Sequence, residues 1–386
     1  MPRVPRAETF EAGEVCVVHC VQRCVRRAYL AGKDAATGKD YSKRRDWIRR
    51  RLEILSAVFG VDVLVYSIMS NHIHVVLRTR PDVVETWSNE EVALRWLRLF
   101  PGRRIDEHLG QPTETDVEAL AKSAGRLKEI RQRLSDVSWF MRSLCEPIAR
   151  LANKQDECTG RFWEGRFKAQ RIADEAGLLA CAMYVDLNPI RAAMADRPEN
   201  ATHTSAHDRI QSLKGKKVAA AALETKPLAT AEAGEQLKRR TPAQSRKAAR
   251  RRRSQTKQLQ IFKDAWLAPM QLSTLGRPSP KPSRSGVRAS DKGFLSLSVG
   301  DYLALLDWTG RNGRPDKRGK IPRGLQPILD RIGVASEMWC DLVWNFERYF
   351  GRSPAAGHPD SMRDDATRRG RRWSPGQKAT TACFVS

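Results

Sequence analysis

Residues 61–78 read VDVLVYSIMSNHIHVVLR. The runs at 61–68 and 73–77 are rich in β-branched residues, so they predict two strands joined by a tight Met-Ser-Asn turn. His72 and His74 are two residues apart, and in a strand this spacing sends both imidazoles to the same face. Two imidazoles can form half of a divalent metal site. By itself, however, a His-X-His pair is more often a self-satisfied pair on a sheet surface.

The sequence on either side predicts further strands and helices. Residues 15–21 (VCVVHCV) are strand-like, and residues 43–59 place their large apolar side chains at helical spacing. Residues 85–137 contain amphipathic stretches and predict a helical insertion. Residues 160–172 predict a basic, aromatic hairpin, and a helix follows over roughly 174–193. These elements together predict an α+β protein.

Composition narrows the class of protein. The chain has 386 residues with 69 Lys and Arg against 44 Asp and Glu, which gives a formal charge of +25. We find no run near the ~18 apolar residues that a membrane helix needs, and the N-terminus lacks the apolar core of a signal peptide. Eight cysteines without a compact framework suit a reducing cytosol. Membrane and disulfide-rich secreted proteins are therefore excluded, and a polyanionic partner is favoured.

Charge and complexity divide the chain into unequal parts. We expect a disordered lead at 1–14 and a folded domain at 15–200. Residues 201–293 are basic and poor in large apolar side chains, so we expect a largely disordered linker. Residues 294–350 regain enough aromatic and aliphatic side chains for a small helical unit. The last segment, 351–386, is again polar and basic and predicts a disordered tail.

Two further features carry possible chemistry. Tyr184 and Asn188 are four residues apart on a predicted helix, so the phenol and the amide share one face. The plainer interpretation is that Tyr184 is a packing residue and that Asn188 with Pro189 ends the helix. The segment 161–168 (RFWEGRFK) offers cations for phosphates and aromatic rings that can stack on bases. The alternative there is an edge hairpin whose aromatic rings belong to the core.

In combination, these pieces resemble the single-tyrosine HUH transposases, which include the REP-associated tyrosine transposases. The resemblance covers about residues 15–200, and the order and separation of the pieces also match. The matching pieces are VHCVQRCVRR at 18–27, YSIMSNHIHVVLR at 66–78, GRFWEGRFKAQ at 160–170 and YVDLNPIRA at 184–192.

The resemblance implies a fold and a set of roles. The fold would be an antiparallel ferredoxin/RRM-like sheet with helices on one face. His72 and His74 would bind Mg²⁺ or Mn²⁺, with Asn188 as the third ligand. Tyr184 would attack a phosphodiester of single-stranded DNA, which gives a 5′-phosphotyrosine and a free 3′-hydroxyl. A 3′-hydroxyl would then reverse the step, so the strand is rejoined without ATP.

The implied partner is single-stranded DNA, including hairpin-forming DNA, and no membrane. The expected location is cytoplasmic, with nucleoid association when DNA is bound, and both a monomer and a homodimer remain open. The residues expected to contact DNA are Gln22, Arg23, Arg161, Arg166, Lys168, Arg191, Arg250, Arg251, Arg252 and Arg253. We also hypothesise that the basic run 246–253 and the unit 294–350, through Trp308 to Arg311, grip DNA beside the cleavage site.

Several alternatives stay open. A domesticated, non-catalytic DNA-binding protein would show the same charge, and so would an RNA-binding protein on an RRM-like sheet. Cys16, His19, Cys20 and Cys24 have the ligand types of a zinc site, but a strand sends Cys16 and Cys20 to one face and His19 to the other. Tyr66, on the strand before the histidine pair, is expected in the core.

Overall fold

The computed structural model of the chain describes residues 11, 13–25, 32, 38–101, 112–224, 262–272, 281–312 and 326–384. They form an α+β fold around a five-stranded sheet of order β2-β3-β1-β4-β5. All neighbouring strands are antiparallel except β4 and β5, which are parallel. The strands are β1 Val17–Arg23, β2 Val61–Ile68, β3 His72–Thr79, β4 Lys168–Ile172 and β5 Ala355–Ala356.

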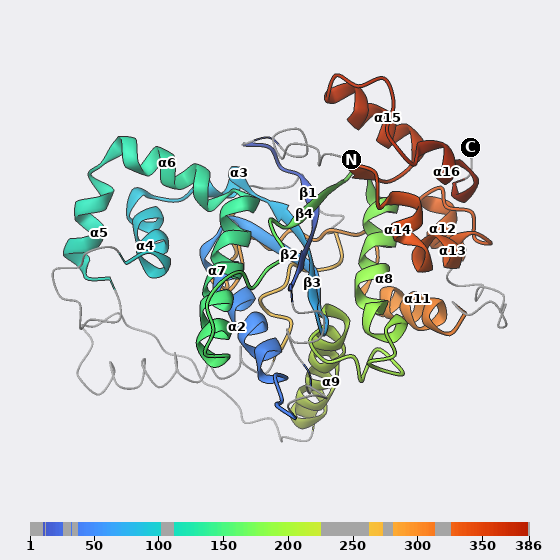
Figure 1. Cartoon of the computed structure of the whole chain (residues 1–386), viewed down its shortest axis with the longest axis horizontal. Coiled ribbons are helices and arrows are strands. Elements are labelled where there is room, and N and C mark those ends of the chain that lie inside the picture. Colours follow the sequence, from blue (N-terminus) through green and yellow to red (C-terminus); the bar gives the residue numbers. More distant parts are fainter. Residues whose placement is uncertain are drawn as a thin grey trace.

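The described helices lie around this sheet (Figure 1). They are α2 Lys43–Val58, α3 Pro81–Val84, α4 Asn89–Leu99, α5 Glu114–Ala121, α6 Ala124–Leu134, α7 Val137–Gln155, α8 Glu175–Arg191, α9 Ser205–Glu224, α11 Val299–Asn312, α12 Gln326–Arg331, α13 Trp339–Trp344, α14 Phe346–Phe350, α15 Pro359–Arg368, α16 Gln377–Thr380 and the 3₁₀ turn Thr381–Cys383. Helices α4, α5 and α6 fall within the segment 85–137, where a helical insertion was expected.

Two expectations about the sheet need correction. The sheet is mixed rather than purely antiparallel, because β5 comes from the C-terminal part of the chain and pairs in parallel with β4. Helices cover both faces of the sheet rather than one. Figure 1 shows α2 and α7 on one side of the strands and α8, with the C-terminal helices, on the other. The C-terminal part therefore belongs to the same fold as the histidine strand.

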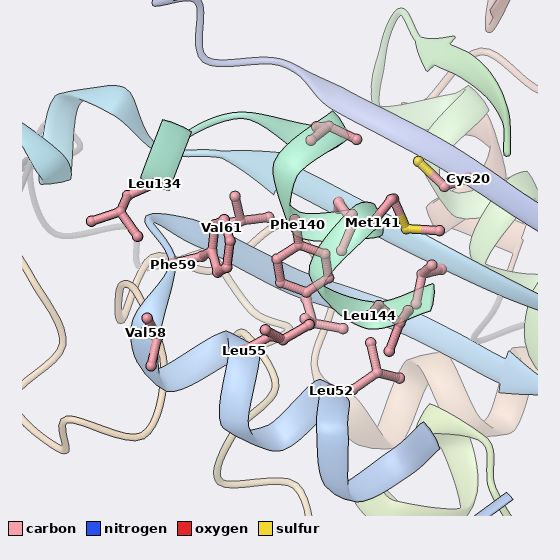
Figure 2. Close-up of a cluster of buried hydrophobic side chains, with 14 of the residues drawn as sticks. Cys20, Leu52, Leu55, Val58, Phe59, Val61, Leu134, Phe140, Met141 and Leu144 are labelled. Atoms are coloured by element: carbon pink, nitrogen blue, oxygen red, sulfur yellow. The ribbon is translucent and has the colours of Figure 1, made fainter. Parts of the chain in front are cut away.

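The first face of the sheet is closed by an apolar core (Figure 2). Val18 and Cys20 of β1 and Ile73, Val75 and Leu77 of β3 all point into it and are almost fully buried. Their partners on α2 and α7 include the side chains of Leu52, Leu55, Phe140, Met141 and Leu144. Burial of such side chains contributes roughly 1.5–3 kcal/mol each. This core fixes which residues of β1 and β3 point to the opposite face.

Helix α8 and the C-terminal helices pack on the second face of the sheet, where their side chains form a second apolar core. Asp174 begins α8 by accepting a hydrogen bond from Gly177 N at 2.7 Å, as N-cap residues do. A Cβ at Gly177 would lie 2.5 Å from the carbonyl oxygen of Ala356. Glycine at this position therefore allows the first turn of α8 to approach β5 closely.

The segment 201–293 differs from the expected disordered linker wherever the structure describes it. It begins with α9, and residues 262–272 and 281–293 run along the outer edge of β2. Ala268 N donates to Val63 O at 2.9 Å, and Ser290 N and Oγ both donate to Asp62. Apolar side chains within a polar stretch explain the order, because Trp266, Leu267 and Met270 are buried. Residues 225–261 and 273–280 lie outside the described part.

The segment 351–386 also differs from the expected disordered tail. It contains β5, α15 and α16, and its apolar side chains Met362, Ala366, Cys383 and Phe384 are buried. A few apolar residues at the correct helical positions are enough, since α8 and the helices from 299 onward already provide a surface to pack on. No helix within the described ranges has the length and apolar character needed to cross a membrane.

Candidate active site

Two elements bring the candidate residues together on the second face of the sheet. His72 and His74 lie on β3 and share a face, as the strand spacing predicts. Helix α8 crosses this face and contacts both β2 and β3. The ring of Tyr184 meets the His74 ring edge-on, with a centroid separation of 5.5 Å. Asn188, one turn later, has its Nδ2 3.1 Å from His74 Nε2.

A third histidine, His19, completes this cluster, and the sequence analysis did not place it there. It lies on β1, next to β3, and its Nε2 is 2.9 Å from His74 Nδ1. His72 Nδ1 lies 2.5 Å from Asn71 Oδ1. When both Nδ1 atoms carry the proton, they donate to His19 and Asn71. The Nε2 lone pair of His72 is then left for a metal ion, and that of His74 faces the amide of Asn188. Imidazoles that bind a metal through one ring nitrogen commonly donate a hydrogen bond from the other.

Burial keeps these imidazoles neutral. It lowers the pKa of His19 to about 4. It also lowers the pKa of His72 to about 4, with a further contribution from the positive charge of Arg23. The pKa of His74 is well below its usual value because the ring is fully buried beside two other imidazoles. A neutral imidazole is the form that binds a metal ion.

The imidazoles of His72 and His74 fit a divalent cation if a third ligand lies nearby. Within the ranges that the structure describes, no three His, Cys, Asp or Glu side chains are grouped as a metal site. The amide of Asn188 is a candidate third ligand, because its nitrogen lies 3.1 Å from His74 Nε2 and its oxygen would face His74 after a half-turn of the amide. Two imidazoles and one amide oxygen suit Mn²⁺, and Mg²⁺ with more water ligands.

The structure disfavours the zinc alternative. Cys16, Cys20 and Cys24 are buried on the first face, in the apolar core. His19 points to the second face, where it bonds to His74. The predicted separation of the cysteines from His19 is confirmed, so these residues do not converge on one ion.

Tyr184 is enclosed by residues of the C-terminal helices. Its side chain is 3% exposed, and its hydroxyl donates to Glu347 Oε1 at 2.8 Å. The Phe346 ring stacks on the Tyr184 ring at 5.0 Å, and the guanidinium carbon of Arg191 lies 5.0 Å from the same ring centre. Burial and the negative charge of Glu347 raise the pKa of the Tyr184 phenol. Phe346 and Glu347 were not among the predicted site residues.

A pocket of about 410 Å³ opens beside these groups. The three histidines line its sheet side, and Phe346, Glu347 and residues 351–353 line the opposite side. Gln170 fixes the turn after α14 to the sheet, because its Nε2 donates to Phe350 O and Ser353 O at 2.6 and 2.8 Å. Tyr184 is not among the lining residues, whereas the two residues that contact its ring and hydroxyl are.

The pocket rim is mainly basic. Four cationic side chains line it, against two carboxylates, Glu164 and Glu347. The cations are Arg23, Arg166, Lys168 and Arg352, and all four are exposed. The first three were expected to contact DNA. Arg352 was not, because it follows α14 in the C-terminal part of the chain.

The other residues that were predicted to contact DNA are buried, are bonded to other groups, or lie away from the pocket or outside the described residues. Gln22 is 3% exposed and donates to Gly165 O at 2.9 Å, so it holds the loop 164–166 in place. Arg161 is exposed but does not line the pocket. Arg191 contacts the Tyr184 ring. Arg250, Arg251, Arg252 and Arg253 lie outside the described residues. Arg311 of α11 is paired with Asp307 at 2.9 Å.

Of the two interpretations of segment 161–168, the structure supports the one in which the aromatic rings belong to the core. Phe162, Trp163 and Phe167 are 2%, 8% and 8% exposed and belong to the apolar core of the first face. Trp163 Nε1 also donates to Cys145 O on α7 at 2.9 Å. The aromatic residues anchor the segment, and its charged residues Arg166 and Lys168 remain at the pocket.

Comparison with known proteins adds little to this geometry. No protein-family model matches the chain, and no curated protein matches it. One solved structure that matches is described as "Structure of the REP associates tyrosine transposase bound to a REP hairpin". The match has 9% identity and a TM-score of 0.33, and it covers 54% of this chain and 86% of that chain. A similarity of this size supports no argument about fold or function, so the chemistry has to rest on the residues themselves.

Proposed function

We propose that the protein is a metal-dependent tyrosine transposase that cleaves and rejoins single-stranded DNA. One observation carries the proposal: His72 and His74 from β3 and Tyr184 and Asn188 from α8 lie together beside a basic pocket. A protein that only binds DNA has no need of this set. The proposed partner is single-stranded DNA, including hairpin-forming DNA, and the four cations at the pocket would bind its phosphates.

The proposed reaction forms one phosphorus–oxygen bond and breaks another. The Tyr184 oxygen attacks the phosphorus, the phenol loses its proton, and the bond from phosphorus to the 3′-oxygen breaks. The 3′-oxygen takes up a proton, and the 5′-phosphate stays on Tyr184. Attack by a 3′-hydroxyl reverses these steps and conserves the energy of the phosphodiester bond.

This chain's residues would have distinct tasks in that reaction. His72, His74 and Asn188 would hold Mg²⁺ or Mn²⁺. A bound divalent cation would polarise the scissile phosphate and stabilise developing negative charge. His19 and Asn71 would keep the two histidines in the tautomer that binds metal. Before attack, the Tyr184 hydroxyl has to exchange its bond to Glu347 for contact with the phosphate.

The experiment that tests this proposal is a cleavage assay on labelled single-stranded DNA from the flanks of the gene, with Mn²⁺ or Mg²⁺. We expect a denaturation-resistant protein–DNA adduct in the wild type and none in Tyr184→Phe. Tyr349→Phe is the matched control, because Tyr349 also donates to a carboxylate, Asp341, in the same unit. Adduct formation by Tyr184→Phe would place the nucleophile elsewhere. DNA binding without any adduct would favour a non-catalytic DNA-binding protein.

A further inference from the structure

Several arginines far from the pocket are paired with carboxylates. On α6, Arg126 and Arg133 both pair with Glu129. On α7, Arg142 and Arg150 share Glu146. Such i,i+3 and i,i+4 pairs hold the arginine side chains against a carboxylate of their own helix, although each cluster keeps one excess positive charge.

Cations at the pocket and on the nearby C-terminal surface differ from these. Within the described ranges, no ion pair is present for Arg23, Lys168, Arg352 or Arg372, and all four are exposed. The first three line the pocket. Arg372 lies in the turn between α15 and α16, which Figure 1 shows in the same C-terminal group of helices as α14.

The residue after Arg372 is an exposed tryptophan. Trp373 is 67% exposed, and the other exposed large apolar side chains of the described residues are aliphatic: Val15, Val25, Ile54 and Leu151. An exposed indole that directly follows two arginines, Arg371 and Arg372, has the character of a stacking platform for an unpaired base. The structure gives this ring no role in the apolar cores.

The turn that carries Trp373 is fixed to the pocket rim. Ser374 is 2% exposed, and its Oγ lies 3.0 Å from Oγ of Ser353, which lines the pocket. Trp373 and Arg352 are each one residue away from this contact. Since adjacent Cα atoms are about 3.8 Å apart, Arg352 and Trp373 extend from backbone positions that one short stretch of a single strand can contact.

We propose that the single strand leaves the pocket over Arg352 and reaches Arg372 and Trp373, where one unpaired base stacks on the indole. This inference deepens the proposed function and rests on it for the identity of the strand. It assigns the turn 370–375 to DNA binding, a role that the sequence analysis gave to other residues.

The test measures binding separately from cleavage. The full-length chain carries Tyr184→Phe so that no adduct forms, and the probe is a labelled single strand of about 15 nucleotides, within the size range of single-strand sites. Trp373→Ala should weaken binding roughly 5- to 140-fold, and Trp373→Phe should retain most of the affinity. Leu151→Ala on α7 is the matched control for loss of an exposed apolar side chain and should leave affinity unchanged.

A second series tests the path of the strand. Arg352→Gln and Arg372→Gln should each lower the slope of log affinity against log salt by about 0.7. Arg150→Gln, at an exposed and paired arginine, should not change the slope. Unchanged affinity in Trp373→Ala would overturn the inference. Equal losses on single-stranded and duplex DNA, or tighter binding of RNA of the same sequence, would also overturn it.

The cleavage reaction at Tyr184 and the stacking site at Trp373 can be tested independently of each other. If Tyr184 forms an adduct and Trp373→Ala binds normally, the proposed reaction stands and the stacking site is wrong. If no adduct forms and Trp373→Ala loses affinity for single strands alone, the stacking site stands and the proposed reaction is wrong.

Discussion

The two faces of the sheet use the same strands for different purposes. On the first face, Val18 and Cys20 of β1 and Ile73 and Val75 of β3 pack against α2 and α7 with almost no exposure. On the second face, the alternate residues include the three histidines. The period of two in a strand lets the apolar face fix the backbone while the other face carries polar groups. Substitutions of neighbouring residues should therefore have opposite kinds of effect.

His72→Ala should give the largest effect on activity. Loss of one proposed metal ligand removes several kcal/mol of transition-state stabilisation, or about 1,000-fold in cleavage rate. The side chain is only partly buried, so the free energy of unfolding should change by less than about 1 kcal/mol. Adduct formation and chemical denaturation of the same preparation measure both quantities. Cleavage at the wild-type rate would remove His72 from the site.

Ile73→Ala is the counterpart on the first face. It leaves a cavity in the apolar core of the first face, and the free energy of unfolding should fall by about 2–5 kcal/mol. Cleavage measured well below the unfolding transition should stay within about tenfold of wild type, because the side chain points away from the site. Denaturant titration gives the stability change. A stable variant without activity would contradict the separation of the two faces.

Acid should destabilise the metal-free protein through His19. Burial lowers the folded-state pKa of His19 to about 4 from 6.5, so the unfolded chain binds the proton more readily between these values. The contribution of His19 to stability is present above pH 6.5 and is lost as the pH falls toward 4, by about 3 kcal/mol. In chelator-treated protein, His19→Gln should show a shallower loss of stability over this range. Identical pH profiles would contradict the assignment.

Glu347→Gln should have the smallest effect. Removal of the negative charge next to the Tyr184 hydroxyl lowers the pKa of the phenol, because Glu347 raises it in the wild type. Absorbance of the phenolate during an alkaline titration, with Tyr184→Phe subtracted, measures this change. Asp341→Asn, beside Tyr349, is the control and should leave the titration of Tyr184 unchanged. A higher pKa in Glu347→Gln would contradict the charge effect.

The sequence predicts the local part of this fold well. Strands at 61–68 and 73–77 follow from β-branched runs, and β2 and β3 occupy Val61–Ile68 and His72–Thr79. Tyr66 is buried as expected, and its hydroxyl donates to Asp208 at 2.8 Å. Residues four apart on a helix share a face, which is why Tyr184 and Asn188 both reach His74.

Long-range contacts explain what the sequence did not predict. His19 meets His74 only because β1 pairs with β3 in a particular register, and a strand pattern does not encode that register. Glu347 reaches Tyr184 across 163 residues. No local period connects such positions. Composition was also misleading, since a few apolar residues in basic stretches, such as Trp266 and Met362, were enough to order them on an existing core.

Strand β2 is the outer strand of the sheet, and its free edge is covered from far along the chain. Ala268 bonds to Val63, and Ser290, 228 residues beyond Asp62, bonds to its carboxylate. During synthesis, β2, β3 and β1 emerge long before the residues that cover this edge. An uncovered apolar edge strand is a template for pairing with other chains. We therefore expect a fragment that ends before residue 262, in which the Val63 end of this edge is uncovered, to aggregate more readily than the full-length chain.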